Sequence, residues 1–249
     1  MTIQYDGTVY HGWQIQQNAK TVQSVITNAL NTLTRESINL IGAGRTDSGV
    51  HALGQAANFK TSKELDLYRF RYSLNSMLPH DIAVRKMMLV DENFHSRYDA
   101  ISRTYWYIVY KEKSPFFRRY GYYYHHTIDI DYLNRCSDRI LGERDFRNFA
   151  KELPGNDNAN CTVVAARWRD LGDRYLFRIE ANRFLHSMVR IIAGTLLRFQ
   201  NDKIALEEID TLFLPDGKLL TGPSVPPCGL FLREVKFGHY ILEKKYRQT

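Results

Sequence analysis

Cysteine is scarce in this chain, and no two cysteines lie close together. Cys136, Cys161 and Cys228 are the only three among 249 residues, and no Cys-x-x-Cys pair occurs. An odd, scattered set predicts no disulfide framework and favours a reducing compartment, the cytoplasm. A zinc deaminase needs two cysteines at close spacing, so that class is excluded. The eight histidines show no metal-ligand spacing either, and we expect no bound metal.

Long apolar runs and phosphate-binding loops are also missing. The longest apolar stretch, residues 188–197, contains an arginine and is too short to span a bilayer. No secretory hydrophobic region opens the chain. No glycine-rich loop continues into Lys-Ser or Lys-Thr, and no glycine series has the dinucleotide-binding spacing. We therefore expect no membrane span and no nucleotide cofactor.

The composition is that of an ordinary globular protein with a basic balance. Apolar residues make up 44% of the chain and there are seven prolines, which excludes a disordered protein. The length allows one large domain or two linked halves with a sizeable core. The net charge of +7 favours a polyanionic partner, although charge alone does not separate RNA from DNA or an acidic membrane. A generally soluble basic protein would carry the same charge.

Hydrophobic spacing predicts mixed strands and helices in residues 1–110. Thr21 is a typical N-cap for a helix whose apolar residues recur at helical spacing as far as Leu33. A second helix, over residues 66–78, is expected to end at Pro79, which does not continue a helix. Strands are predicted over residues 37–41, 55–61, 82–90 and 101–110.

A basic segment, residues 111–119, separates this half from the next. It contains Ser114-Pro115, which is typical of a connector, so we expect one half over residues 1–110 and another over 111–249. Asn182 is expected to cap a long helix. The predicted elements of the second half are a β-like run at 121–125, a hairpin of 162–169 with 174–180, helices at 130–141, 183–199 and 206–213, and a strand at 230–237.

The most informative segment is residues 42–51, Gly-Ala-Gly-Arg-Thr-Asp-Ser-Gly-Val-His. Its single carboxylate, Asp47, is surrounded by three glycines and follows Arg45 by two residues. Glycine tolerates positive φ angles and close approach of other backbone, so this segment can present one acid at the end of a sheet. An aspartate beside glycine is also a common turn former that bonds its own backbone, and the motif alone leaves that structural role open.

Arg190 and Tyr105 are the next candidates. Arg190 lies in a predicted apolar helix on one face with His186 and Gly194, where a buried guanidinium needs a carboxylate or several carbonyls. It either has such partners or reaches water along its stem. Gly194, one turn on, would let other backbone approach closely. Tyr105 shares a strand face with Tyr107, and aromatic residues on strands are more often core than binding platforms.

Five motifs, in order along nearly the whole chain, resemble the TruA family of tRNA pseudouridine synthases. Residues 44–51, Gly-Arg-Thr-Asp-Ser-Gly-Val-His, resemble the family's Gly-Arg-Thr-Asp-Ala-Gly-Val-His signature. The other motifs are Tyr-Asp-Gly…Gly-Trp-Gln at 5–14, Arg-x-Tyr-x-Tyr at 103–107, Phe-x-His-x-Met-Val-Arg at 184–190 and Gly-Leu-x-Leu at 229–232. Only three residues separate Met1 from the first motif, fewer than is usual in the family, so we expect a short first strand or a trimmed start.

The resemblance implies a fold and an activity. The fold would be α+β, with two similar halves that share a central, mainly antiparallel sheet, helices on one side and a cleft between the halves. The activity would be isomerisation of uridine to pseudouridine at positions 38, 39 and 40 in the anticodon stem-loop of tRNA. The resemblance also implies that no metal or cofactor is needed and that the working form is a homodimer.

The resemblance also implies residue roles. Asp47 would be the nucleophile, and attack on C1′, attack on C6 and assistance in losing the 2′ proton all remain open. Arg190 would pair with Asp47, Tyr105 would stack on the target base, and Arg45 would contact the RNA backbone or fill the gap left by the flipped base. A base-releasing N-glycosylase and a non-catalytic RNA-binding module are the rival classes. Basic residues that could contact phosphates are Arg69, Arg71, Lys111, Lys113, Arg118, Arg119, Arg167 and Arg169.

Overall fold

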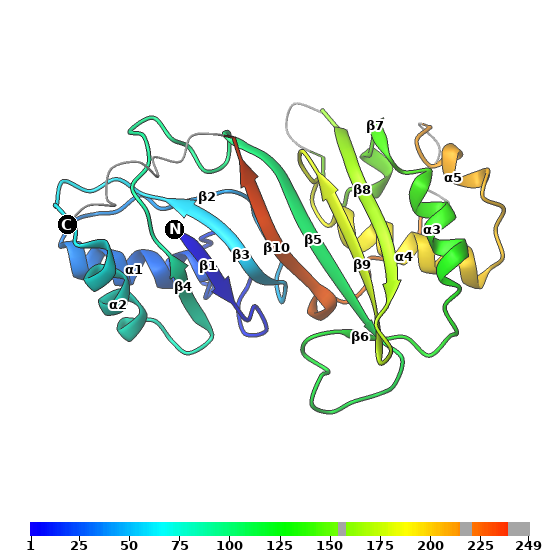
Figure 1. The fold of residues 1–249 in the computed structure, drawn as a ribbon, viewed down its shortest axis with the longest axis horizontal. Coiled ribbons are helices and arrows are strands. Elements are labelled where there is room, and N and C mark those ends of the chain that lie inside the picture. Colours follow the sequence, from blue (N-terminus) through cyan, green and yellow to red (C-terminus); the bar gives the residue numbers. More distant parts are fainter. Residues whose placement is uncertain (154–157, 215–220, 239–249) are drawn as a thin grey trace. The chain divides into compact units, whose positions relative to one another are not determined.

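The computed structural model describes residues 1–153, 158–214 and 221–238. The described chain divides into two compact units, one of residues 1–101 with residues 232–238, and one formed by the described residues between 102 and 231. Figure 1 shows the helices and strands of both units, coloured by their position in the sequence. The domain boundary expected between residues 110 and 111 stays a prediction.

The first unit is a small antiparallel sheet with two helices. Its strand order is β4-β1-β3-β10, with β2 paired to β3, and β1 is antiparallel to both β3 and β4. The first strand, β1, has four residues, and a short strand and a trimmed start both remain open. The elements are β1 (Thr2–Tyr5), α1 (Val22–Thr34), β2 (Ile41–Gly42), β3 (His51–Asn58), α2 (Leu67–Met77), β4 (Ile82–Lys86) and β10 (Leu230–Phe237).

Local sequence signals explain both helices of this unit. The side chain of Thr21 accepts a hydrogen bond from the backbone N–H of Ser24 at 3.3 Å, so the predicted N-cap is confirmed. Asp66 caps α2 in the same way, accepting from the N–H groups of Tyr68 and Arg69. The helix ends before Pro79, as predicted.

The strand predicted over residues 37–41 is wrong except at its last residue. Ile38 and Leu40 are buried, but side chains of α1 bind the backbone that a strand partner would need. Asn31 accepts from the N–H of Ile38 at 2.8 Å, and Gln23 donates to the carbonyl of Leu40 at 2.8 Å. With these backbone groups satisfied, the segment runs alongside α1 without a sheet partner.

The second unit is also built on an antiparallel sheet, in the order β5-β9-β8-β7, with β6 added parallel to β5. Asn134 attaches α3 to it, because its side chain donates to the carbonyl of Trp168 at 3.2 Å and accepts from its N–H at 2.8 Å. The elements are β5 (Ala100–Tyr110), β6 (Tyr122–Tyr123), α3 (Ile130–Asp138), β7 (Gly142–Asp145), η1 (Arg147–Phe149), β8 (Asn160–Asp170), β9 (Arg174–Ala181), α4 (Met188–Asn201), α5 (Glu208–Thr211) and η3 (Pro227–Gly229).

The predicted start of the long helix is wrong. Asn182 does not cap it, because its side-chain oxygen accepts from the N–H of Thr162 at 2.9 Å and so joins β8 to β9. The helix α4 begins only at Met188, after Ser187 in the left-handed conformation with φ 59°. The other two predicted helices of this half are shorter than expected, and the hairpin of β8 and β9 is confirmed.

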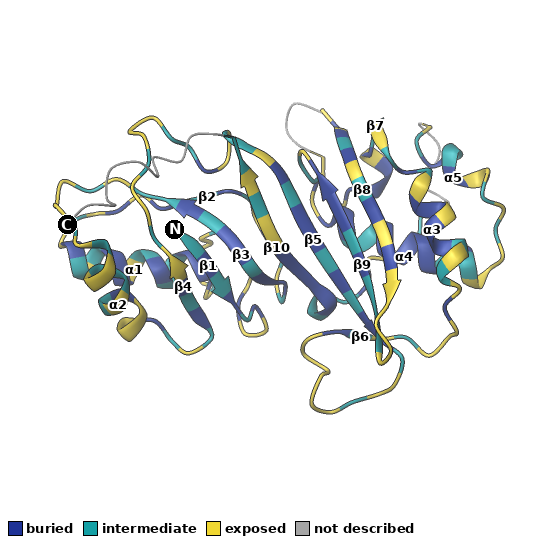
Figure 2. Cartoon of the chain, in the orientation of Figure 1, coloured by how far each residue is buried: buried dark blue, intermediate teal, exposed yellow. Residues whose placement is uncertain are grey.

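Burial follows the two sheets and their helices, as Figure 2 shows. In the second unit the rings of Trp168 and Phe177 stack at 4.7 Å across paired strands, a favourable cross-strand contact. Exposed residues are frequent in helix α2 and in the loop between β5 and β6, among other segments. The expected α+β class with a mainly antiparallel sheet is confirmed.

Candidate active site

Asp47 lies in the loop between β2 and β3. A tight turn follows it, closed by the N–H of Val50 donating to the carbonyl of Asp47 at 3.1 Å. Gly49 has φ 76° in this turn, a conformation that favours glycine. The Asp47 side chain is half-buried, whereas Arg45 is exposed. The loop therefore presents one acid and one cation at the end of strand β3.

The backbone of the first motif holds this loop from one side. The N–H of Trp13 donates to the carbonyl of Thr46 at 3.1 Å. Gly12 has φ 82°, and a Cβ on it would stand 2.4 Å from the Thr46 carbonyl oxygen and 3.2 Å from the carbonyl carbon of Asp47. Only glycine fits a contact this close. The two motifs at 5–14 and 42–51 are thus in direct contact in the fold.

Side chains of the same motif complete the support. A 2.8 Å hydrogen bond joins the hydroxyl groups of Tyr5 and Thr46 in the interior. Trp13 is 1% exposed, its ring centroid lies 6.0 Å from that of Tyr5, and a Cβ on Gly42 would stand 2.4 Å from its Nε1 atom. The residues before Asp47 are therefore held by packed aromatic groups.

Tyr10 supports the turn after Asp47. Its carbonyl accepts from the N–H of Gly49 at 3.2 Å and from the Ser48 hydroxyl at 3.3 Å. Its own hydroxyl donates to Asp81 at 2.6 Å, and burial, with this bond to a carboxylate, raises the pKa of Tyr10. Gly12 and Thr46 are members of the sequence motifs, whereas Tyr10 lies between the two parts of the first motif and had no sequence signal of its own.

Arg190 is the third residue of α4 in the second unit. Its Nε donates to the carbonyl of Val225 at 2.8 Å, and the N–H of Val225 donates back to the carbonyl of Arg190 at 3.3 Å. One turn on, a Cβ on Gly194 would stand 1.9 Å from the Pro223 oxygen, so the close approach that we expected at Gly194 is confirmed. These contacts fasten the segment around Pro223 to the first turns of α4.

Tyr105 is buried on β5, opposite Ile179 of β9. It is 7% exposed, and Phe184 meets its ring edge-on at 5.1 Å. On the same strand face, Tyr107 donates its hydroxyl to the carbonyl of Pro226 at 2.9 Å, and burial raises its pKa. The motifs at 103–107 and 184–190 are thus in contact, as the first two motifs are.

The structure therefore brings the candidate residues together in two groups. Asp47 and Arg45 share one loop of the first unit. Tyr105 and Arg190 belong to two motifs of the second unit, 103–107 and 184–190, that are in contact through Tyr105 and Phe184. The pairing of Asp47 with Arg190 stays a prediction.

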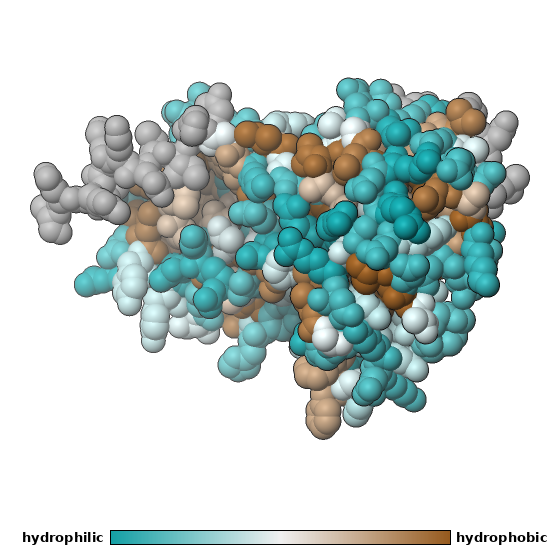
Figure 3. Space-filling model, turned by 45° about the vertical axis from the view of Figure 1, so that its right-hand side comes forward, coloured by the Kyte–Doolittle hydropathy of each residue, from teal (hydrophilic) through white to brown (hydrophobic). Residues whose placement is uncertain are grey.

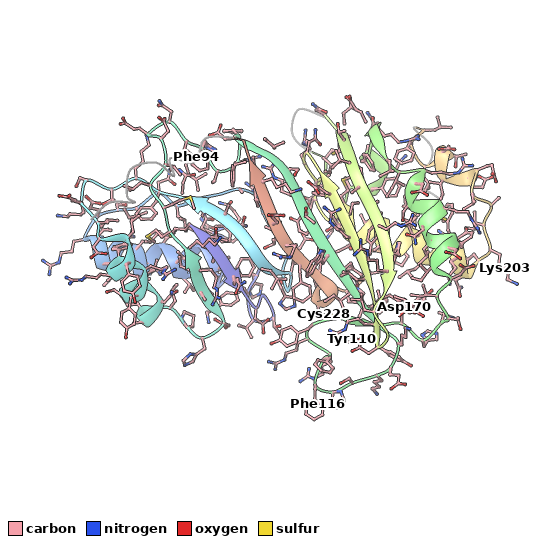
Figure 4. The ribbon with its side chains drawn as sticks, viewed as in Figure 1. Phe94, Tyr110, Phe116, Asp170, Lys203 and Cys228 are labelled. Carbon is pink, nitrogen blue, oxygen red and sulfur yellow. The ribbon has the colours of Figure 1, made fainter. Side chains whose placement is uncertain are left out.

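The candidate basic residues differ in whether they form an ion pair with a carboxylate of this chain. Lys111 is 2.8 Å from Asp170, Arg167 is 3.8 Å from Asp138, and Arg69 is 3.5 Å from Asp66. Within residues 111–119 of the described chain, the exposed cations without an ion pair to a carboxylate are Lys113, Arg118 and Arg119. They flank Phe116, which is 84% exposed and lies at the end of the loop in Figure 4.

Neither a metal cluster nor a membrane helix is found in the described chain. Within residues 1–153, 158–214 and 221–238, no group of three or more His, Cys, Asp or Glu side chains could hold a metal ion. None of the helices described is long and apolar enough to cross a membrane. On the face in Figure 3, hydrophilic groups predominate and hydrophobic ones form several separate areas.

The mixed α+β fold with antiparallel sheets is consistent with the class of pseudouridine synthases. The sequence profile of the family described as tRNA pseudouridine synthase matches residues 1–99 and 137–238. The chain belongs to this family, and it is a tRNA-modifying isomerase.

Full-length relatives support the same assignment. A tRNA pseudouridine synthase A of Caldicellulosiruptor bescii is 40% identical over 247 residues, with 95% of this chain and 98% of the relative covered. That of Acetivibrio thermocellus is 40% identical over 239 residues, with the same coverage of both chains. That of Bacillus subtilis is 35% identical over 240 residues, covering 95% and 97%.

Proposed function

We propose that Asp47 is the nucleophile that converts uridine to pseudouridine in the anticodon stem-loop of tRNA. The observation that supports this role most is the way the loop is held. Trp13 and Gly12 fix Thr46 on one side of the acid, and Tyr10 fixes Gly49 on the other. A reacting group held rigidly by its neighbours loses little entropy on reaching the transition state.

The chemistry suits a carboxylate. The N1–C1′ bond of uridine breaks, the uracil turns in place, and C5 bonds to C1′; C5 then loses its proton and N1 takes up one, so that the product is an isomer of the substrate. Asp47 can form a covalent adduct at C1′ or at C6, or assist loss of the 2′ proton. Each path needs one ionised acid beside the sugar and base, and none needs a metal or a redox cofactor.

The other candidate residues have supporting roles in this proposal. Arg190 would keep Asp47 ionised and oriented, because a neighbouring cation favours the charged carboxylate. Tyr105 would hold the flipped base by stacking, as enzymes that act on a single base require. Arg45, exposed two residues from Asp47, would contact the RNA backbone or occupy the space left by the base.

The target and the assembly follow from the family resemblance. We propose uridines 38, 39 and 40 as substrates, a homodimer as the working form, and the cytoplasm as its location. The net charge of +7 supports a polyanionic substrate. Lys113, Arg118 and Arg119, exposed on the loop between β5 and β6, are the first phosphate contacts to test.

The test compares Asp47→Asn with Ser48→Ala, a neighbour in the same turn. Both proteins are incubated with tRNA, and pseudouridine is mapped position by position. We expect Asp47→Asn to bind tRNA and to form no pseudouridine, because an amide has a similar shape but is a poor nucleophile. Ser48→Ala should remain active, because its hydroxyl makes only one long bond of 3.3 Å.

Three outcomes would contradict the proposal. Substantial turnover by Asp47→Asn would remove Asp47 from the nucleophile role. Release of free uracil by the unchanged protein would indicate an N-glycosylase. Tight binding of tRNA without any new pseudouridine would indicate an RNA-binding module.

A further inference from the structure

An open groove lies in the first unit, between helix α2 and the strand β4. Its volume is about 450 Å³, within the range of roughly 300–1,000 Å³ that ligand sites occupy. Tyr68, Arg71 and Tyr72 line it from the helix, and Arg85 lines it from the strand. Helix α2 lies beside β4 in Figure 1, and Figure 2 shows how exposed its outer face is.

Two aromatic rings on this surface are exposed to solvent. Tyr68 and Tyr72 are each 72% exposed and, four residues apart, lie on the same side of the helix. Such rings contribute little to the core. They offer flat faces one helical turn apart, an arrangement suited to unpaired nucleobases, since every base can stack on an aromatic ring.

Cations accompany these rings. The guanidinium of Arg71 lies 5.9 Å from the centroid of the Tyr68 ring, and Arg85 and Lys86 are exposed on β4. No carboxylate is among the residues that line the groove. A groove with aromatic faces and unneutralised positive charge is complementary to a single-stranded polyanion.

The floor of the groove argues against a peptide ligand. The strand β4 is the edge of its sheet, and an open edge usually pairs with an added strand. Here Asn75 accepts from the N–H of Val84 at 2.7 Å and donates to its carbonyl at 3.0 Å, and Arg71 donates to the carbonyl of Arg85 at 2.7 Å. The N–H and carbonyl of Val84 and the carbonyl of Arg85 are therefore already bonded to side chains of α2, whereas the rings remain available.

We propose that the groove between α2 and β4 binds an unpaired stretch of the RNA substrate, away from the uridine that reacts. One or two bases stack on Tyr68 and Tyr72, and the phosphates beside them approach Arg71 and Arg85. The inference rests on the proposed action on tRNA and adds a second contact to it. Such a contact increases the affinity for RNA without taking part in the reaction.

The first experiment measures RNA affinity and reaction rate separately. Binding of labelled tRNA is measured by fluorescence anisotropy, and single turnover is measured at saturating enzyme. Tyr68→Ala with Tyr72→Ala should weaken binding by roughly 5- to 150-fold per base that loses its stacking partner. The rate at saturation should stay unchanged, and Tyr68→Phe with Tyr72→Phe should retain affinity because the ring faces remain.

A matched control comes from the same unit. Tyr98 is 75% exposed and has Arg97 at 5.7 Å from its ring centroid, yet it lies outside the groove. Tyr98→Ala should bind tRNA with the same affinity as the wild-type protein. For the charges, Arg85→Gln should reduce the slope of log affinity against log salt by about 0.7, whereas Arg135→Gln, on the exposed side of α3, should not.

A cross-linking experiment locates the RNA directly. A tRNA containing 4-thiouridine is irradiated with the protein, and the modified peptides are identified by mass spectrometry. Adducts at residues 68–72 are expected, with loss of these adducts in the double Ala variant. Thermal melts of every variant check that it is folded.

The outcomes separate this proposal from the proposed function. Unchanged affinity in the double Ala variant, or cross-links only elsewhere, would overturn the groove as an RNA site while leaving Asp47 untouched. A double Ala variant whose sedimentation shows a new oligomeric state would identify the surface as a contact between copies of this chain, and would overturn the RNA assignment. If the wild-type protein cross-links to tRNA at the groove but forms no pseudouridine, the result would support the groove as an RNA site and contradict the proposed function.

Discussion

Replacement of Gly12 by alanine should strongly slow pseudouridine formation, although glycine has no side chain that could take part in the reaction. A Cβ at this position would stand 2.4 Å from the carbonyl oxygen of Thr46, whereas ordinary contacts begin at 3.4 Å. The backbone before Asp47 therefore has to move by about 1 Å to admit one methyl group. A displacement of that size at a reacting group costs on the order of 100-fold in rate.

The stability of the protein should fall as well, for a separate reason. Gly12 has φ 82°, and a non-glycine residue held in such a conformation costs about 1–3 kcal/mol. For a chain of this size, each kcal/mol lowers the melting temperature by about 2–4 °C. Gly12→Ala should thus melt roughly 2–12 °C lower, and at assay temperatures well below its melting point it should still be largely folded.

Gly44→Ala is the matched control within the Asp47 loop. No atom lies within 4 Å of the position that its Cβ would take, and its φ is not in the left-handed region. Its melting temperature should equal that of the unchanged protein within error. Single-turnover pseudouridine formation and thermal melts are measured for both variants. Normal turnover and an unchanged melting temperature for Gly12→Ala would refute the argument that this contact positions Asp47.

Three further predictions concern the second unit and the cysteines. Arg190→Met should slow pseudouridine formation, and its effect in a double-mutant cycle should not add to that of Asp47→Ala; additivity within about 0.5 kcal/mol would mean that the two residues do not interact. Tyr105→Ala should lower the free energy of unfolding by about 3–5 kcal/mol, because the ring is buried, whereas Tyr105→Phe should keep both stability and tRNA affinity. Activity is counted per folded molecule, and normal activity of the Ala variant would remove Tyr105 from base stacking. Cys136 and Cys161 should resist iodoacetamide at pH 8 in the native protein, because burial raises the pKa of each thiol to about 11; rapid alkylation seen by mass spectrometry would contradict this.

The sequence by itself determined the elements that local signals specify. Thr21 predicted the start of α1, and Pro79 predicted the end of α2, because an N-cap oxygen and a missing N–H act within a few residues. Strand β5 and the hairpin of β8 and β9 could also be predicted, because the alternation of residue types along a strand is a local signal as well. The motifs indicated the family, and with it the candidate residues Asp47, Arg190, Tyr105 and Arg45.

Only the tertiary structure decided how distant residues share their hydrogen bonds. Residues 37–41 have the pattern of a strand, but Asn31 and Gln23 of α1 take up their backbone groups. Asn182 has the sequence of a helix cap, but Thr162, twenty residues away, donates to its side chain. A periodicity reports which side of a segment is apolar, and it contains no information on which partner will satisfy the backbone.

The same limit applies to the loop that presents Asp47. The sequence indicated that its glycines permit a close approach, and it did not say what approaches. The structure shows that the first motif does, through Gly12 and Trp13 against Thr46 and through Tyr10 against Gly49. These contacts join residues more than thirty positions apart, so they depend on how the strands pair and the helices pack, and no local pattern encodes them.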